Sequence, residues 1–314
     1  MIAIPSIHSF NFILFRGAGY SLDAVKKQID DMVEKCAINT VNFIVMAGQE
    51  HTYSTEILWQ DNPRIPEDED LVALFRYAKD KGLRRIMKPM VNPMDGYWRA
   101  FIRFFDEDVP CEPKWSQWFA SYTEYIRHYA VLSEQEGVEM LIAGCELVGT
   151  DHREAEWRAL IADVRKVYSG LVTYNCDKYQ EHNVKWWDAC DVISSSGYYP
   201  VNDWPRQIAR IQAVVEKFDK PFFFSEVGCP STAGSGMIPN DWTLVGKSPV
   251  DLEEQVNFFR IMFDSCEPLP WHYGYSIWDW PCLVKPDYNP ATDAGYAVID
   301  KPAGDYIKLR YQVP

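Results

Sequence analysis

Two glutamates stand where apolar segments of the chain end. Glu146 closes the segment 142–147, and Glu226 lies near the end of the segment 222–228. A strand buried on both faces has no favourable place for a carboxylate except where it emerges, so both glutamates are expected at the C-terminal ends of their strands. A facing pair of carboxyl groups suits glycoside hydrolysis, because one protonates the leaving oxygen while the other acts at the sugar carbon or on water. The alternative is that either glutamate forms a structural ion pair.

The elements that must position these glutamates follow an alternating pattern of apolar strands and amphipathic helices. Eight such units in 314 residues predict an α/β fold, a (β/α)8 TIM barrel, in which residues 1–314 form a single catalytic domain. The expected strands are 10–16, 40–46, 85–91, 140–147, 171–175, 192–198, 221–227 and 273–279. The expected helices are 21–37, 66–81, 115–136, 153–168, 204–218 and 250–266. The fifth connection, near 180–190, is too short to assign a helix.

The connections that follow the predicted strands are long, whereas those that precede them are short. In a parallel barrel the long connections all fall on one face, which is the face where active sites lie. Three loop tryptophans, Trp59, Trp98 and Trp242, are candidates for the wall of a cleft there. Each of them could equally pin its own loop to the barrel.

Composition limits the kinds of partner. The formal charge of −14 and the absence of clustered Lys and Arg argue against nucleic acid. Aromatic residues reach 15%, with 12 tryptophans, and indole rings pack well on the apolar faces of sugars. Many of these rings will be core, but together with the facing glutamates they agree with an oligosaccharide or polysaccharide substrate. The oligomeric state stays open.

The eight cysteines are scattered without a close pair at metal-binding spacing. The six histidines form no cluster at predicted strand ends, which argues against a metal-dependent isomerase or nuclease barrel, so neither a metal nor a cofactor is expected. No segment has the length of a membrane span and none has the character of a secretory leader, so no membrane partner is expected. A cytoplasmic location fits, and secretion remains open if a leader was removed.

Several motifs resemble a known family along nearly the whole chain. They are Lys88-Pro89, Trp98-Arg99, Gly144-Cys145-Glu146-Leu147, Gly197-Tyr198-Tyr199-Pro200, Ser225-Glu226-Val227-Gly228 and Lys301-Pro302-Ala303. Together they are similar to the β-mannanases of glycoside hydrolase family 113, which belong to the retaining clan A of (β/α)8 glycosidases. The resemblance implies that Glu146 is the general acid/base and Glu226 the nucleophile.

The resemblance also implies roles for aromatic residues after strands six and eight. In the clan, a tyrosine after strand six hydrogen-bonds the nucleophile, which corresponds to Tyr198 rather than Tyr199. The end of strand eight supplies the indole floor under the sugar. Trp278 is the first choice for that floor, and Trp280 the second because it is two positions on and should face the same way.

One position departs from the clan pattern. The acid/base is usually preceded by an asparagine that contacts the sugar 2-hydroxyl, and here that residue is Cys145, whose thiol is a poor hydrogen-bond partner. Cys145 is a candidate for contact with the substrate at this position, but another group must then supply the hydrogen bond, or activity is lower. Asn92 and Lys88, on strand three, are further candidates for contacts with sugar hydroxyls, and both could instead be structural.

The function implied by the resemblance is double-displacement hydrolysis of β-1,4-linked manno-oligosaccharides or mannan by an enzyme of β-mannanase or β-mannosidase type. Two alternatives stay open: a retaining clan A glycosidase for another neutral β-linked sugar, and a non-catalytic carbohydrate-binding barrel. The sequence fixes neither endo nor exo action, and it does not fix the length of the substrate.

Overall fold

Eight parallel strands form a closed barrel in which each strand pairs with its neighbours in sequence and β8 pairs with β1. The computed structural model describes residues 4–312, so the ends of the predicted domain, residues 1–3 and 313–314, lie outside the described residues. The strands are β1 (Ile7–Ile13), β2 (Thr40–Gln49), β3 (Arg84–Pro93), β4 (Met140–Cys145), β5 (Leu171–Cys176), β6 (Ile193–Ser196), β7 (Phe222–Val227) and β8 (His272–Pro281). The predicted (β/α)8 barrel is confirmed, and each predicted strand overlaps an observed one.

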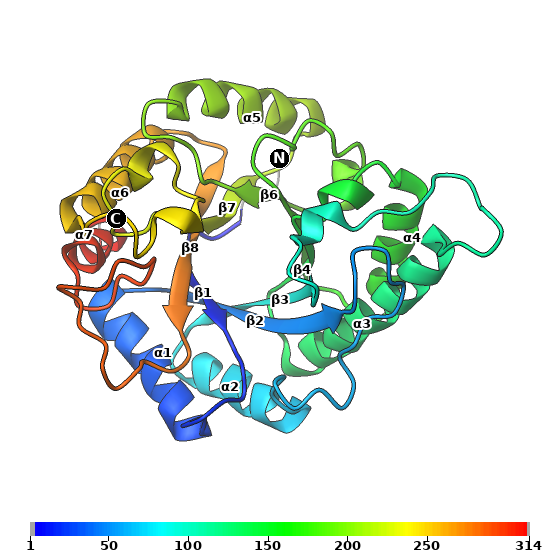
Figure 1. Ribbon diagram of the computed structural model, residues 1–314, viewed down its shortest axis with the longest axis horizontal. Coiled ribbons are helices and arrows are strands. Elements are labelled where there is room, and N and C mark those ends of the chain that lie inside the picture. The colour runs from blue at the N-terminus through cyan, green and yellow to red at the C-terminus, as the bar shows by residue number, and fades with distance from the viewer. Residues whose placement is uncertain (1–3, 313–314) are drawn as a thin grey trace.

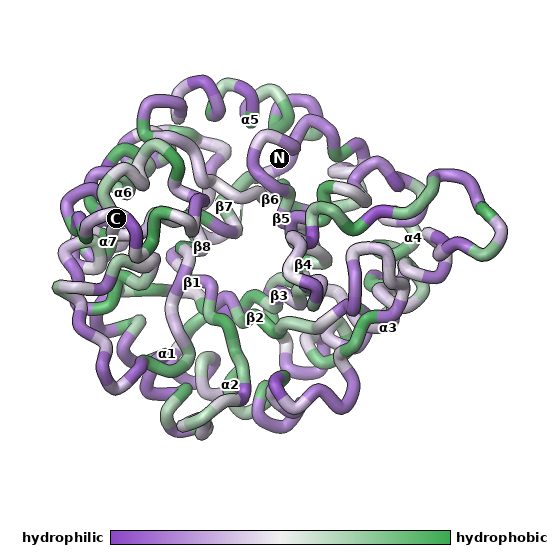
Figure 2. Tube along the Cα trace, in the orientation of Figure 1, coloured by the Kyte–Doolittle hydropathy of each residue, from purple (hydrophilic) through white to green (hydrophobic). Residues whose placement is uncertain are grey.

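Helices surround the barrel (Figure 1). They are α1 (Leu22–Cys36), α2 (Asp68–Asp80), α3 (Trp115–Glu136), α4 (Glu154–Arg165), α5 (Trp204–Phe218), α6 (Leu252–Cys266) and α7 (Pro302–Tyr311). Between β5 and β6 the described chain has only a short 3-10 helix, Trp187–Ala189, which agrees with the short fifth connection. In Figure 2 the turns of α5 alternate between hydrophilic and hydrophobic residues, as expected of a helix with one face on the barrel.

Local signals set the helix ends. Ser21 accepts a hydrogen bond from the backbone N–H of Ala24 at the start of α1, and Asp251 accepts one from Glu254 at the start of α6. Gly137 ends α3 in the left-handed conformation with φ of 63°, where the lack of a Cβ removes the steric cost. The chain then enters β4 within three residues, which brings Glu146 to the opposite end of the barrel.

The barrel interior is layered. Apolar side chains fill its lower part, toward the N-terminal ends of the strands; among them are Ile86, Ile142 and Phe223. Above them lie buried polar residues such as Asn11 and Asn175. Polar side chains inside a barrel need partners because an unpaired buried group costs free energy. The polar layer therefore marks the level at which the interior changes from packing to chemistry.

Three strands carry a one-residue irregularity near their C-terminal ends. On β4, the three-residue step from Ile142 to Cys145 pairs with a two-residue step, from Thr173 to Asn175, on β5. On β7, the irregularity precedes Glu226 in its pairing with β6, and on β8 it lies between Ile277 and Trp280 opposite β1. An extra residue reverses the side to which the following side chains point. These irregularities therefore decide which residues at the top of the barrel face inward.

No described helix combines the length and apolar character that crossing a bilayer would require.

Candidate active site

A cavity of about 490 Å³ opens at the C-terminal ends of the strands. Glu146 and Glu226 both line it, together with Tyr198 and Trp278. The residue types expected at the active face of the barrel are thus brought together from β4, β6, β7 and β8 and the turns that follow them. The roles assigned to these residues stay predictions at this point.

Glu226 is held as a carboxylate by three donors. Its Oε2 accepts a hydrogen bond of 2.8 Å from Lys88 Nζ and a longer one of 3.5 Å from Cys145 Sγ, and its Oε1 accepts one of 2.9 Å from Tyr198 Oη. Burial alone would raise the pKa of Glu226, but the charges of Lys88 and Arg99 and the hydrogen bonds from Lys88 and Tyr198 hold that pKa below its usual range. The side chain is therefore ionised at neutral pH.

Glu146 is oriented from both sides. Its Oε1 accepts a hydrogen bond of 2.6 Å from Ser196 Oγ, and its Oε2 accepts bonds from Arg99 Nη2 at 2.9 Å and from Trp98 Nε1 at 3.3 Å. The residue follows β4 directly and has a φ of 52°, an uncommon conformation for a residue with a side chain. Outliers of this kind are found at sites where the chain must aim a functional group.

A buried polar network joins the two glutamates beneath the cavity. Lys88 donates to Asn175 Oδ1 at 2.7 Å as well as to Glu226. Asn175 Nδ2 donates to Ser196 Oγ at 3.0 Å, and Ser196 in turn donates to Glu146. Because each side chain in this series constrains the next, the relative position of the two carboxyl groups is set by hydrogen bonds from β3, β5 and β6.

Lys88 differs from its predicted role. It was a candidate for contacts with sugar hydroxyls, but its side chain is fully buried and its ammonium group is surrounded by Glu226, Asn175 and Asn11. The reason is that Lys88 lies in the middle of β3, below the level of the cavity. Lys88 therefore acts on the carboxylate and does not reach the substrate space.

Cys145 also lies beneath the cavity, so the prediction that it contacts substrate is corrected. The residue is only 2% exposed, and its Sγ contacts Glu226 and Arg99. Burial raises the pKa of the Cys145 thiol to about 12, so it stays protonated. Arg99 covers Cys145 and lines the cavity. Asn92 lines the cavity too, and its Oδ1 accepts a hydrogen bond of 2.8 Å from Arg99 Nη1.

The two tryptophans of β8 point to opposite sides. Trp278 lines the cavity, and its role as the floor under a sugar stays a prediction. Trp280 is fully buried outside the barrel, where its ring packs edge-on against Phe10 and its Nε1 donates to Gln28 of α1 at 3.1 Å. The prediction that both face the sugar is wrong because the irregularity in β8 breaks the alternation between them. The peptide bond after Trp278 is cis.

The loop tryptophans also divide. Trp98 and Trp242 line the cavity with Glu146 and Glu226, whereas Trp59 lines a separate cavity. Trp242 is 58% exposed and packs against Tyr296 with ring centroids 4.5 Å apart. The rim of the cavity is therefore aromatic and exposed to solvent, an arrangement suited to a ligand with apolar faces and polar edges.

Some residues of the site were not predicted. Arg99 belongs to the Trp98-Arg99 motif, but its role could not be read from a loop position because loop side chains have no periodicity. Ser196 and Asn175 are polar residues in otherwise apolar strands, and this was a signal that could have identified them.

Within residues 4–312, no three His, Cys, Asp or Glu side chains gather in a way that could hold a metal ion. All eight cysteines are unpaired thiols.

Comparison with known proteins gives one family. The model of glycoside hydrolase family 113 matches residues 8–301. No match was found among curated protein sequences.

Solved structures agree with the family match. The structure of a complex of a family 113 β-1,4-mannanase is 45% identical to this chain, covers 99% of it and 100% of its own length, and has a TM-score of 0.95. A family 113 β-mannanase from Alicyclobacillus acidocaldarius, in complex with ManMIm, is 35% identical, covers 98% of this chain and 97% of its own, and has a TM-score of 0.92. A β-glucuronidase from Ruminococcus gnavus, 14% identical with a TM-score of 0.64 over 98% of this chain and 49% of its own, shares the fold alone.

Proposed function

This chain belongs to glycoside hydrolase family 113 and is a glycoside hydrolase, and we propose that it cleaves β-1,4-linked mannan or manno-oligosaccharides with retention of configuration. Glu226 is the nucleophile and Glu146 the general acid/base. The observation that carries these roles is the different surroundings of the two carboxyl groups in one cavity. Glu226 receives the ammonium group of Lys88 and the hydroxyl of Tyr198, whereas Glu146 faces Ser196, Trp98 and Arg99.

In the first step, a carboxylate oxygen of Glu226 attacks the anomeric carbon while Glu146 gives its proton to the departing glycosidic oxygen. A glycosyl ester forms and the bond to the leaving sugar breaks. The lowered pKa of Glu226 keeps the nucleophile ionised at neutral pH. Lys88 and Tyr198 hold the plane of the carboxylate, so little orientational freedom is lost on reaching the transition state.

In the second step, Glu146 removes a proton from water, which attacks the same carbon and releases Glu226 as a carboxylate. Two inversions give net retention. Arg99 and Trp98 both donate to Oε2 of Glu146, so they hold the carboxylate form of the base in place during this step. The indole N–H of Trp98 and the guanidinium of Arg99 can only donate hydrogen bonds. Of the three protein partners, Ser196 is therefore the one that can accept a hydrogen bond from protonated Glu146.

The cavity also supplies the contacts that a neutral sugar needs. Trp278 offers an apolar face. Cys145, which stands in place of the clan asparagine, is buried, and Arg99 contacts its thiol and lines the cavity. Arg99 and Asn92, which are hydrogen-bonded to each other, are therefore the side chains that replace that contact. Hydrogen bonds to this hydroxyl strengthen in the transition state and contribute to rate.

The stereochemistry of azide rescue tests the two roles. With an aryl β-mannoside bearing a good leaving group, Glu226→Ala should be inactive, and azide should restore turnover and give the α-configured, inverted mannosyl azide. Glu146→Ala should still form the glycosyl ester, and azide should release a β-configured, retained product. The two stereochemical outcomes, read by NMR, must not be exchanged, since only removal of the nucleophile frees its face of the ring. An exchange would overturn the assignment.

A substrate panel tests the sugar. Purified enzyme should hydrolyse mannotriose through mannohexaose, and product analysis should show cleavage at β-1,4 mannosidic bonds. Aryl β-glucosides and β-galactosides serve as matched comparisons. Faster hydrolysis of these at equal concentration would refute the mannan proposal while leaving the double-displacement mechanism in place.

A further inference from the structure

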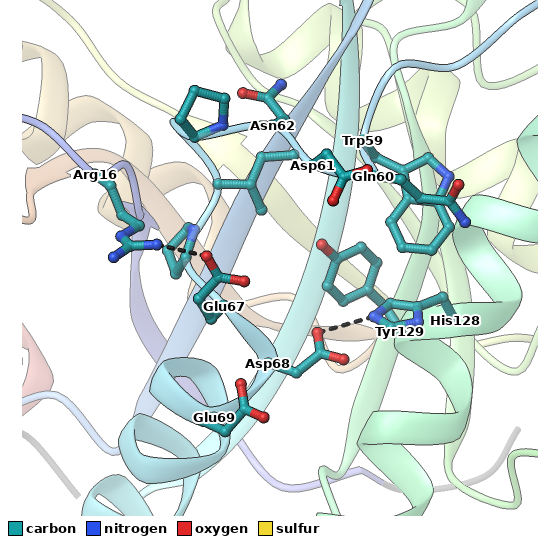
Figure 3. Close-up of a pocket in the computed structure, with 13 residues that line it drawn as sticks. Arg16, Trp59, Gln60, Asp61, Asn62, Glu67, Asp68, Glu69, His128 and Tyr129 are labelled. Atoms are coloured by element: carbon teal, nitrogen blue, oxygen red, sulfur yellow. Dashed lines mark hydrogen bonds and ion pairs between the residues drawn. The ribbon is translucent and has the colours of Figure 1, made fainter.

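A second cavity lies outside the active site. It has a volume of about 750 Å³, larger than the catalytic cavity, and the two share no lining residue in the described part of the chain. Its walls come from the connection between β2 and α2, from the first turn of α2, and from α3 (Figure 3). A volume of this size falls in the range of small-molecule sites.

The hydroxyl of Tyr129 is the most informative group in this cavity. Tyr129 is 2% exposed, and it lines the cavity with its hydroxyl directed into it (Figure 3). Within residues 4–312, no protein group hydrogen-bonds that hydroxyl. Burial and the nearby charge of Asp68 raise the pKa of Tyr129 above its usual value, so the hydroxyl keeps its proton. A nearly buried donor that faces a cavity and has no protein partner is available for a ligand.

Trp59 provides an aromatic wall beside this hydroxyl. Its ring is partly buried and lies 4.6 Å from the ring of His128 and 6.4 Å from that of Tyr129. His128 is in turn fixed by a hydrogen bond of 2.9 Å to Asp68, drawn as a dashed line in Figure 3. These neighbouring rings hold the indole of Trp59 in place, and a fixed aromatic surface lowers the entropy cost of stacking a ligand on it.

The charge of the cavity selects among ligands. Asp61, Glu67, Asp68 and Glu69 line it against one guanidinium, Arg16, which is itself paired with Glu67 at 2.6 Å. This excess of carboxylates disfavours phosphates and uronic sugars. A small organic cation would suit the carboxylates but would leave donors such as Tyr129 and Gln60 without acceptors. A neutral polyhydroxy ligand satisfies both, because hydroxyls donate to carboxylates and accept from the phenol and amide.

We propose that this cavity is a second, non-catalytic binding site for a neutral oligosaccharide, with Trp59 and Tyr129 as its main contacts. The proposal goes beyond the catalytic function, and it rests on the proposed function only for the choice of β-1,4-linked manno-oligosaccharides as ligand. A chain bound there would raise the local concentration of substrate at the same molecule. The site would matter most for long substrates.

Indole NMR signals can test the second site separately from the active site. The background is Glu226→Gln, which keeps the catalytic cavity but stops turnover. Trp59→Phe and Trp98→Phe in that background assign one reporter signal to each cavity. On titration with mannotetraose, both signals should shift and saturate. A shift of Trp98 alone would overturn the second site and leave the proposed function standing, whereas a shift of Trp59 alone would support the second site and count against the catalytic assignment.

Two substitutions test the contacts. Tyr129→Phe should weaken mannotetraose binding at the Trp59 signal about tenfold, as expected for loss of one hydrogen bond to a ligand, and should leave the Trp98 titration unchanged. Tyr53→Phe, an exposed tyrosine outside both cavities, is the matched control and should change neither. If Tyr129→Phe does not fold, Gln60→Ala, at an exposed position, should weaken the same titration.

Tetramethylammonium chloride distinguishes the competing ligand class. If it shifts the Trp59 signal and mannotetraose does not, the cavity is a cation site and the proposal fails. The proposal also fails if Tyr129→Phe and Gln60→Ala both leave the Trp59 titration unchanged. In the otherwise unmodified enzyme, Tyr129→Phe should leave kcat on an aryl β-mannoside as it is and raise KM for soluble mannan.

Discussion

Glu226 and Asp151 are buried to the same extent, each 4% exposed, yet their pKa values move in opposite directions. The pKa of Glu226 lies below its usual range, whereas burial raises the pKa of Asp151 to about 8. Glu226 has an ammonium group 2.8 Å from one oxygen. Asp151 accepts one bond of 2.6 Å from the hydroxyl of Tyr174, and its Oδ2 has no partner in the described structure.

The difference teaches that burial alone does not set the charge of a carboxyl group. Desolvation acts on both residues, and a buried cation reverses its effect at Glu226 only. The cavity thus contains an ion pair that keeps the proposed nucleophile charged, while the outer layer near α4 contains a carboxyl group that stays protonated near neutral pH. Four substitutions should break or sharpen this comparison, and they are ordered by the size of the expected effect.

Lys88→Met should have the largest effect. It leaves Glu226 buried without its cation, a change that costs about 3–5 kcal/mol in comparable buried pairs, so kcat/KM at neutral pH should fall about 100-fold or more. The pKa of Glu226 should rise, because desolvation is no longer outweighed, and the acidic limb of the pH–rate profile should move to higher pH. An equal loss at every pH would contradict this reason. Thermal unfolding checks that the fold is intact, and Lys79→Met, at an exposed position, is the control for loss of a lysine charge.

Asp151→Asn should change stability rather than activity. Because the folded-state pKa of Asp151 is raised to about 8, the stability it contributes is fully present below its unfolded pKa of about 3.9 and is lost as pH rises through about 8. The amide does not titrate, so urea unfolding should show the variant gaining on the parent by about 1.4 kcal/mol per pH unit within that window. Asp80→Asn, at an exposed position, should show no such trend. A pH-independent difference for Asp151→Asn would refute the role of protonation.

Tyr198→Phe should have an intermediate effect. It removes one hydrogen bond of 2.9 Å to Glu226 Oε1 but leaves Lys88 in place, so kcat should fall about tenfold. The acidic limb should shift upward by less than in Lys88→Met. Tyr199→Phe is the matched control, because the Tyr199 hydroxyl donates to Glu181 and not to Glu226. Its pH–rate profile should keep the parental acidic limb.

Cys145→Ala should have the smallest effect. The thiol lies 3.5 Å from Glu226 Oε2, and a thiol is a weak donor, so kcat/KM should change by less than about threefold. Cys176→Ala, at a second buried thiol that ends β5, controls for the loss of packing volume. A loss as large as that of Tyr198→Phe would mean that the thiol matters more to the nucleophile than its geometry suggests.

Much of the fold could be predicted from the sequence, because apolar strands, amphipathic helices and stop signals such as Gly137 agree with one another. The positions of Glu146 and Glu226 at strand ends followed from the cost of burying a carboxylate. The directions of side chains beyond the regular strands could not be predicted. Arg99 lies on a loop, and neither its contact with Glu146 nor its position over Cys145 has a periodic signal.

The interior of the barrel shows a second limit. Lys88 lies in a strand. The sequence indicates which face of the sheet its side chain is on, but not where along the strand the cavity begins. Trp280 was placed beside Trp278 by the rule of alternation, and the rule fails where β8 gains a residue against β1. Such irregularities depend on pairing between strands that are distant in sequence, as β1 and β8 are, so no local pattern reveals them.

The irregularity in β8 also has a consequence for how this enzyme can change over generations. Trp278 lines the cavity and Trp280 anchors the strand to α1 through Gln28, so the two indoles have different structural roles although only one residue separates them. Exchanges at 278 can retune the ligand without loosening a helix. Loss of the single codon between them would remove the extra residue of β8, and simple alternation would still direct Trp278 to the cavity and Trp280 to α1. Either indole can therefore change without moving the other across the barrel wall.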